Sequence, residues 1–276
     1  MPRTLSKLEA TLVSRLEQQE RDIVTLQDIM EILDCSYEHA GFIAHKLEKQ
    51  HWLSRLEPGK YQFVPTSWGP DVNPLLAGSV LIEPYYYSYA TANHFYGFTP
   101  QIPAVVYVVT TRVKRPTEIR GTEYKFVTPK PSKFFGYTVK QVLTSEVMMA
   151  EPEKAIVDSV DKVAYAGGIA EVARVIHSAR NKLVHDGEDG LELTRLIHYA
   201  LRMRSQALVA RLGYLLEALE IPLPTQHEEK LLSGITKSKT YLGSLRRWGK
   251  EGCYNKKWQI VVNVPKEKLF AEIRIV

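Results

Sequence analysis

Cysteine is scarce in this 276-residue sequence, and long apolar runs are missing. The two cysteines, Cys35 and Cys253, are too few for a disulfide framework or a four-cysteine zinc site, so we expect reduced thiols. The longest strongly apolar run, AVVYVV at 104–109, is far shorter than the roughly 18 residues that span a bilayer. The first twenty residues also lack the uninterrupted apolar stretch of a signal peptide. These absences predict a cytoplasmic protein with no membrane partner.

Signatures of catalysis and metal binding are missing too. The eight histidines form no HExxH motif, neither cysteine has a base beside it in the sequence, and no glycine-rich loop could cradle a phosphate. The AGG segment at 166–168 is better explained as a break between two helices. We therefore expect no cofactor, no metal and no enzymatic activity.

Two acidic patterns leave an enzymatic alternative open. Asp71 together with Glu123 and Lys125 matches the loose pattern of a metal-dependent nuclease, in which two carboxylates hold the ion and a lysine assists the attacking water. Asp71 lies more than fifty residues upstream of the other two, and such short matches arise by chance. The second pattern consists of Glu151, Glu153, Asp158 and Asp161. For these we favour helix-dipole complementarity in a first turn and solvent, lysine or arginine partners for the aspartates.

Basic charge is unevenly distributed along the chain. Residues 1–70 hold 8 Lys and Arg against 10 Asp and Glu, whereas residues 101–150 hold 8 against 3 and residues 237–257 hold 7 against 1. A polyanion responds to such local excesses more than to the net charge of +5. Any basic binding surface should therefore lie outside the N-terminal segment.

The first 64 residues predict three helices and a β-hairpin. Leu5, Leu8, Leu12 and Leu16 recur at helical spacing, a second helix with Leu26, Ile29 and Leu33 on one face follows Thr25 as its N-cap, and a third follows Ser36. In the third helix Ala40, Ile43, Ala44 and Leu47 share one apolar arc. The two alternating runs around Pro58-Gly59 indicate the hairpin. This order is typical of a winged helix-turn-helix, and the open alternative is a small helical cap with no ligand.

If this module binds DNA, the third helix, residues 36–50, presents its recognition residues opposite the apolar arc. Phe42 suits a thymine methyl, Glu38 a cytosine amino group, and Lys46 and Lys49 suit phosphates. In the alternative, Phe42 packs on another domain and the charged residues are simply solvated. The complete predicted DNA-binding set is Ser36, Tyr37, Glu38, His39, Phe42, His45, Lys46 and Lys49 on the helix, with Arg55 and Lys60 on the hairpin.

Residues 65–84 are rich in proline and glycine, which predicts a linker. Beyond it, Tyr85, Tyr89, Ala92 and Tyr96 follow helical spacing up to Gly97, so we expect one helix with a buried aromatic face. Two β-rich runs follow at 104–111 and 123–129, then several periodic helices, then strands in KWQIVVNVP and FAEIRIV. The predicted class is α+β: a winged helix-turn-helix at 1–64, the linker at 65–84 and a larger mixed α/β domain at 85–276.

Several phrases, taken together and in order, resemble the AbiEi antitoxins of type IV toxin–antitoxin systems. They are YYYSYATANHFYGFTPQIPAVVYVVTT, AEPEKAIVDSVDKVAYAGGIAEVARVI, ARLGYLLEAL and KWQIVVNVP, which span most of the chain from about Pro84 to Pro265. The resemblance implies a repressor that binds inverted repeats of double-stranded DNA in its own promoter. It also implies an antitoxin that counteracts a nucleotidyltransferase-type toxin in phage defence, directly or indirectly. The matched phrases are mostly apolar, so they do not indicate which residues neutralise the toxin.

The weak charge of the N-terminal segment indicates that tight DNA binding would need a dimer or basic residues further along the chain. Candidates for DNA-phosphate or partner contacts are Arg112, Lys114, Arg115, Lys125, Arg246, Arg247, Lys250, Lys256 and Lys257. The alternative is that these cations only solvate the surface. Besides an antitoxin and a nuclease, a DNA-binding regulator with no toxin partner also fits the sequence.

Overall fold

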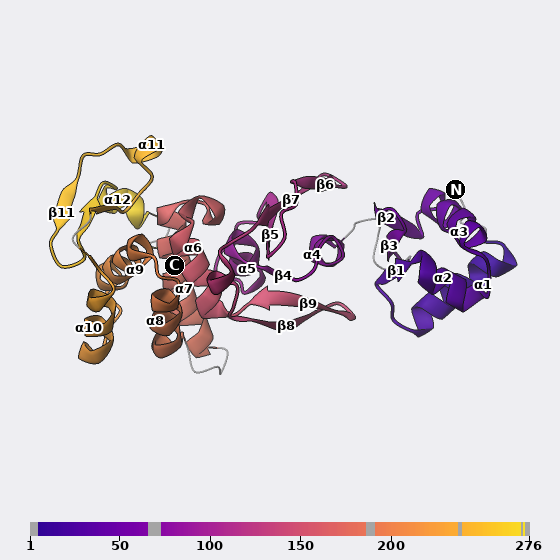
Figure 1. The fold of residues 1–276 in the computed structure, drawn as a ribbon, viewed down its shortest axis with the longest axis horizontal. Coiled ribbons are helices and arrows are strands. Elements are labelled where there is room, and N and C mark those ends of the chain that lie inside the picture. Colours follow the sequence, from indigo (N-terminus) through magenta and orange to yellow (C-terminus); the bar gives the residue numbers. More distant parts are fainter. Residues whose placement is uncertain (1–4, 66–72, 186–190, 237–238, 272, 274–276) are drawn as a thin grey trace.

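The structure, a computed structural model, describes residues 5–65, 73–185, 191–236, 239–271 and 273. Within these ranges it combines helices with three sheets, which confirms the α+β class. Figure 1 shows an N-terminal unit at one end, a six-stranded sheet in the middle and a group of helices at the other end. None of the helices in the described ranges is both long enough and apolar enough to cross a membrane.

The N-terminal unit, residues 5–64, contains three helices and a three-stranded antiparallel sheet in the order β1-β3-β2. Its helices have a local reason to begin where they do. Ser6 and Thr25 form capping boxes with Glu9 and Asp28, and the Ser36 hydroxyl accepts a hydrogen bond from the His39 N–H. The elements are α1 (Lys7–Gln18), β1 (Ile23–Thr25), α2 (Leu26–Leu33), α3 (Tyr37–Lys49), β2 (Leu53–Glu57) and β3 (Lys60–Phe63).

The core of the N-terminal unit follows the predicted helical faces, with one error. The apolar arc of α3 is buried, and so are Leu12, Leu16 and Ile29. The prediction was wrong for Leu8, which is exposed, because α1 turns this edge of its apolar stripe toward solvent. Gly59 has a φ of +76° between β2 and β3, a conformation that glycine adopts at no steric cost.

The six-stranded sheet has the order β6-β7-β5-β4-β9-β8. Its central pairs β5–β7 and β4–β9 are parallel, and the other pairs are antiparallel. The elements of this part are α4 (Pro74–Ser79), β4 (Tyr85–Tyr87), α5 (Tyr89–Phe95), β5 (Val105–Thr110), β6 (Thr117–Ile119), β7 (Thr122–Val127), the short 3-10 helix η1 (Pro131–Lys133), β8 (Tyr137–Val142) and β9 (Ser145–Ala150).

Two predictions for this region were wrong in detail. The tyrosines do not share one helix: Tyr85 and Tyr87 lie on the central strand β4, and α5 begins only at Tyr89. They are nevertheless buried, because β4 pairs on both sides. The predicted linker is also interrupted by α4, where Leu76 is buried against the sheet. Asn73 caps α4 and Pro74 starts it, so this proline begins a helix.

The remaining helices form the end farthest from the N-terminal unit. They and the small sheet β10-β12-β11 share one large apolar cluster, centred on the fully buried Trp258. The elements are α6 (Pro152–Asp161), the 3-10 helix η2 (Val163–Ala166), α7 (Ile169–His185), α8 (Leu193–Arg202), α9 (Gln206–Ala218), α10 (Thr225–Ser233), β10 (Thr240–Tyr241), α11 (Leu245–Trp248), β11 (Cys253–Asn255), β12 (Ile260–Val262) and α12 (Lys266–Leu269).

In this region the predicted helix starts agree with the structure better than the strand predicted in the C-terminal tail does. Pro152 opens α6, and Gly167 and Gly168 adopt positive φ values between η2 and α7, as expected. The strand expected in FAEIRIV is not formed where the chain is described. Phe270, Ala271 and Ile273 follow α12 in a bend and turn, and Glu272 and residues 274–276 lie outside the described ranges.

Polar contacts join the N-terminal unit to the six-stranded sheet. Asp22, which is buried, accepts a hydrogen bond of 3.1 Å from the backbone N–H of Thr144 in the β8–β9 turn. Arg120, in the β6–β7 turn, donates from Nε to the Ser54 hydroxyl of β2 at 3.2 Å. Leu56 of the β2–β3 hairpin belongs to the apolar cluster of the sheet. The unit is therefore held against the sheet by contacts at several turns.

Candidate nucleic-acid interface

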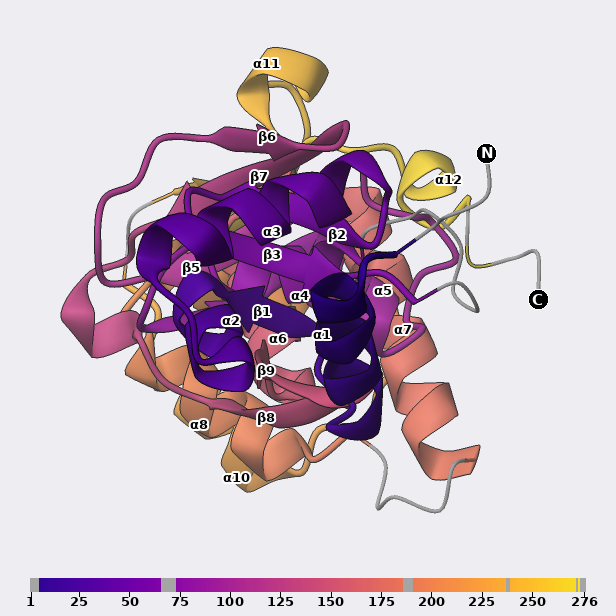
Figure 2. The same ribbon diagram turned by 90° about the vertical axis from the view of Figure 1, so that its right-hand side faces the viewer.

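Helix α3 lies on the surface of the N-terminal unit with one face free (Figure 2). Its apolar arc packs on the unit, and all eight predicted recognition residues from Ser36 to Lys49 are exposed. Two aromatic side chains stand out on this face, since Tyr37 is 64% exposed and Phe42 is 56% exposed. Exposed rings beside lysines can contact base edges and phosphates together.

The cations of α3 have different surroundings. Lys46 Nζ lies 4.9 Å from the centre of the Phe42 ring and 3.6 Å from Oε1 of the buried Glu9 on α1. Lys49, by contrast, makes no ion pair with the described residues. Lys46 therefore braces Phe42 against α1, while Lys49 keeps its whole charge available to a polyanion.

The two cations predicted on the β2–β3 hairpin have different surroundings. Arg55 is exposed on β2. The Lys60 ammonium instead donates to the Val80 carbonyl at 2.7 Å and lies 3.8 Å from Glu57. The contact of Lys60 with DNA stays a prediction, and its ammonium is less free than the Arg55 guanidinium because it already binds the segment after α4.

The basic loop before β6 also contributes fewer free cations than its sequence suggests. Arg112 and Arg115 are exposed, but Lys114 donates to Glu57 Oε1 at 2.6 Å and to the Leu81 carbonyl. Lys114 thus links the loop to the β2–β3 hairpin through hydrogen bonds within the molecule. Arg120, which reaches Ser54, was not among the predicted residues, because nothing in the local pattern distinguishes it from a solvated arginine.

The C-terminal cations surround α11. Arg246, Arg247, Lys250 and Lys256 are exposed, and none of them pairs with a carboxylate of the described residues. Lys257 differs because Glu217 and Glu228 lie 2.7 and 3.0 Å from its Nζ, which raises its pKa. The charge of Lys257 is therefore engaged within the molecule, unlike the charges of the other four residues. In both views α11 and β6 lie toward the upper side of the molecule, while α3 lies nearer mid-height and, in Figure 1, at the opposite end of the long axis from α11 (Figures 1 and 2).

The nuclease pattern gains no support from the residues that can be located. Asp71 lies outside the described residues. Glu123 and Lys125 are on β7, but the Lys125 ammonium lies 5.1 Å from the centre of the Tyr165 ring. In the part of the chain that the structure describes, no cluster of three or more His, Cys, Asp or Glu could hold a metal ion. Lys125 therefore makes a cation–π contact with Tyr165, and its contact with a DNA phosphate stays a prediction.

The acidic residues of α6 have basic partners, as favoured from the sequence. Asp158 is buried and paired with the fully buried Lys154, and Asp161 pairs with Lys133 at 3.0 Å. Glu153, in the first turn, accepts a hydrogen bond from the Glu192 backbone N–H, and its burial raises its pKa. The buried Lys154 was missed, although its i,i+4 spacing from Asp158 is the signal that could have revealed the pair.

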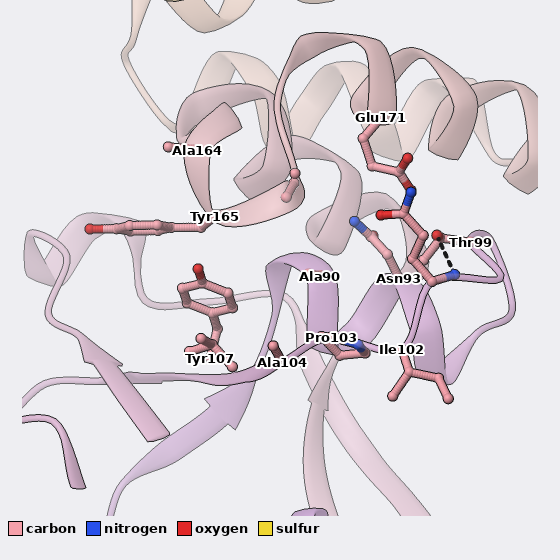
Figure 3. Close-up of a pocket in the computed structure, with 14 residues that line it drawn as sticks. Ala90, Asn93, Thr99, Ile102, Pro103, Ala104, Tyr107, Ala164, Tyr165 and Glu171 are labelled. Atoms are coloured by element: carbon pink, nitrogen blue, oxygen red, sulfur yellow. Dashed lines mark hydrogen bonds between the residues drawn. The ribbon is translucent and has the colours of Figure 1, made fainter. Parts of the chain in front are cut away.

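A cavity of about 260 Å³ lies between α5, the segment leading into β5, and η2 with the start of α7 (Figure 3). Tyr107 and Tyr165 line one side of it, and Asn93 and Glu171 line another. Glu171 is bound by Arg174 at 2.5 Å, and the Asn93 amide donates to Ser159 at 3.0 Å. Among the described residues that line this cavity there is no lysine or arginine to pair with a phosphate.

The fold has a counterpart among solved structures. A crystal structure of the RV2827C protein from Mycobacterium tuberculosis superimposes with a TM-score of 0.68, covering 98% of this chain and 96% of that chain. The two sequences are 16% identical, so the match shows a shared fold and no shared activity. No protein-family model and no curated protein matches the sequence.

Proposed function

We propose that this protein is a DNA-binding autorepressor that also acts as the antitoxin of a type IV toxin–antitoxin system, with a nucleotidyltransferase-type toxin as its counterpart. The observation that carries the DNA-binding half is the free face of α3, where Phe42 and Tyr37 are exposed beside Lys49. The order α1-β1-α2-α3-β2-β3 supports a winged helix-turn-helix, in which such a helix enters the major groove.

The basic residues outside α3 support a second element of the proposal. α3, with only two lysines on its free face, offers little charge for phosphate binding, and affinity for a duplex depends strongly on the number of neutralised phosphates. Arg246, Arg247 and Lys250 are exposed cations on or beside α11, which lies above α3 in both views and at the opposite end of the long axis in Figure 1. We propose that they contact the DNA backbone while α3 contacts bases, with two copies of the chain on an inverted repeat.

The antitoxin half rests on the resemblance to the AbiEi antitoxins. The phrases that carry it form β4, β5, α6 and α9, which are mostly buried, so they support a shared architecture. Direct binding of the toxin and indirect antagonism are both compatible with such an architecture. The alternative function, a DNA-binding regulator with no toxin, is supported by the same exposed face of α3. It differs only in having no antitoxin activity.

A footprint on the DNA upstream of the gene tests the repressor half. We expect protection of an inverted repeat, and loss of protection in the double variant Phe42→Ala/Lys49→Ala. A matched control is Val139→Ala/Lys140→Ala on β8, which also removes one exposed apolar side chain and one lysine. Equal footprints for the wild type and the α3 variant would remove the repressor half.

Co-expression with the nucleotidyltransferase encoded beside the gene tests the antitoxin half. We expect growth to be restored by the wild type and also by the Phe42→Ala/Lys49→Ala variant supplied from an unrelated promoter. Absence of such a neighbouring gene, or no restoration by the wild type, leaves a regulator without a toxin. Co-purification at physiological salt then separates direct binding from indirect antagonism.

A further inference from the structure

A second and larger cavity, which we name the α6 cavity, has a volume of about 540 Å³. It lies where the end of α6 meets η1, the start of α5 and the turn between α8 and α9. Its inner wall is formed by side chains that are almost completely buried, among them Tyr86, Tyr89, Val109 and Met203. The cavity is thus a recess in the body of the domain, and the lining residues Lys130, Lys162 and Arg204 are exposed to solvent.

The two carboxylates that line the α6 cavity are already neutralised. Asp158 pairs with the buried Lys154 and accepts a hydrogen bond of 2.8 Å from the Ser88 hydroxyl. Asp161 accepts a hydrogen bond of 3.0 Å from Lys133. A bound ligand therefore meets two ion pairs at this wall, which offer no free negative charge to attract a cation.

Three further cations at the opening have no such compensation. Lys130, Lys162 and Arg204 line the cavity, and within the described part of the chain no carboxylate forms an ion pair with any of them. They come from three different segments, next to η1, after α6 and after α8. The hydroxyl-bearing residues Thr128, Ser132 and Ser205 line the same cavity. Converging cations with hydroxyl donors form the usual surroundings of a bound phosphate group.

Tyr89 contributes an uncharged hydroxyl donor to the α6 cavity, and its backbone conformation and ring contacts indicate a rigid wall. Burial, reinforced by the nearby Asp158 and Asp161 carboxylates, raises its pKa well above the ordinary value of 10.0, so the hydroxyl keeps its proton. This hydroxyl makes no hydrogen bond with the described residues. The Tyr89 backbone has a φ of +57°, a conformation that bulky residues rarely adopt. Its ring packs edge-on against Tyr107 and Tyr165, and these contacts hold the wall in place.

We propose that the α6 cavity binds a small molecule through its phosphate group, which the side chains of Lys130, Lys162 and Arg204 hold at the opening. Three uncompensated cations exceed what a single carboxylate needs and match the charge of a phosphate dianion or a diphosphate. A recess of this size admits a phosphate with a small attached group and is too small to receive a duplex. The site is separate from the free face of α3, so it does not rest on the proposed function.

Titration calorimetry on the full chain tests this site with three probes: inorganic phosphate, pyrophosphate and ATP. We expect at least one of them to bind, and the affinity to fall at least tenfold in Lys130→Ala/Arg204→Ala, because each charge-assisted hydrogen bond contributes strongly. Both residues are exposed, so the variant should keep its fold, which circular dichroism checks. Arg204→Glu is a second variant that should abolish binding by charge reversal.

The control variant Lys266→Ala/Lys268→Ala removes two exposed cations of α12, elsewhere on the surface, and should leave probe affinity unchanged. The order of the three affinities identifies whether free phosphate or a nucleotide is the source of the group. No heat of binding from any probe at millimolar concentration, or equal losses in the cavity and control variants, would overturn the proposal. Displacement of bound pyrophosphate by a short duplex without the operator would assign the cations to DNA instead.

Discussion

Lys154 is the most unusual residue of the chain, since its ammonium is fully enclosed and pairs with Asp158. The Tyr86 hydroxyl lies 3.1 Å from the same ammonium, so the charge is hydrogen-bonded as well as paired. Such a pair need not stabilise the fold more than apolar residues would. Removal of one partner alone, however, leaves an uncompensated buried charge.

We therefore expect Asp158→Ala to lower the free energy of unfolding by about 3–5 kcal/mol. The double variant Lys154→Met/Asp158→Leu should lose much less, because no charge remains in the interior. Urea denaturation of both variants and the wild type measures the difference. A double variant as unstable as the single one would show that the pair itself, and not the orphaned lysine, determines stability.

Gly213 on α9 provides a second prediction at this scale. A Cβ at this position would overlap the six-membered ring of Trp258, which is fully buried. We expect Gly213→Ala to destabilise the protein by about 1–3 kcal/mol and to shift its tryptophan fluorescence, since the indole must move. Gly41→Ala is the matched control. No atom lies within 4 Å of a Cβ there, and alanine is the better helix former on α3, so stability should rise by roughly 0.5–1 kcal/mol.

Among the elements, α2 shows how one capping residue makes stability depend on pH. Burial opposes ionisation of Asp28, but hydrogen bonds from the Thr25 side chain and backbone, together with Arg21, outweigh it and lower its pKa below 3.8. A carboxyl with a lowered folded-state pKa contributes stability above its unfolded pKa, and the contribution is lost as the pH falls through the folded value.

We expect Asp28→Asn to reduce the rise in stability between about pH 2 and pH 5 and to lower the plateau above that range. Urea midpoints at a series of pH values measure the effect. Glu31→Gln, one turn further along α2 and exposed, is the control and should leave the curve unchanged. Parallel curves for Asp28→Asn and the wild type would contradict the capping argument.

The elements that could be predicted from the sequence are those with local signals. The N-caps Thr25 and Ser36, the Pro58-Gly59 turn and Pro152 each fix a boundary through residues a few positions apart, and each was confirmed. Tyr85, Tyr89, Ala92 and Tyr96 fit a helical period equally well, and only pairing of β4 with β5 and β9 makes the first of them part of a strand. The ion pairs of Lys114 and Lys257 were equally hidden, since their partners Glu57 and Glu217 lie 57 and 40 residues away along the sequence.

For the whole molecule, the proposed phosphate contacts near α11 predict a salt effect. Each lost contact should lower the slope of log affinity against log salt by roughly 0.9. We expect the full chain with Arg246→Ala/Arg247→Ala/Lys250→Ala to show a shallower slope for operator DNA than the wild type. Lys257→Ala, whose charge is bound by Glu217 and Glu228, should leave the slope unchanged. Identical slopes for the triple variant and the wild type would exclude Arg246, Arg247 and Lys250 as phosphate contacts.

The contacts of Asp22, Ser54 and Glu57 with the six-stranded sheet have a geometric consequence for such binding. They hold α3 at a fixed angle to the rest of the chain, so DNA binding would depend on the spacing of the contacted segments as well as on their base sequence. A duplex carrying the correct bases would also have to present its backbone to α11 at the matching helical phase. Insertion of half a helical turn between the two contact regions should then weaken binding as severely as a change of base sequence.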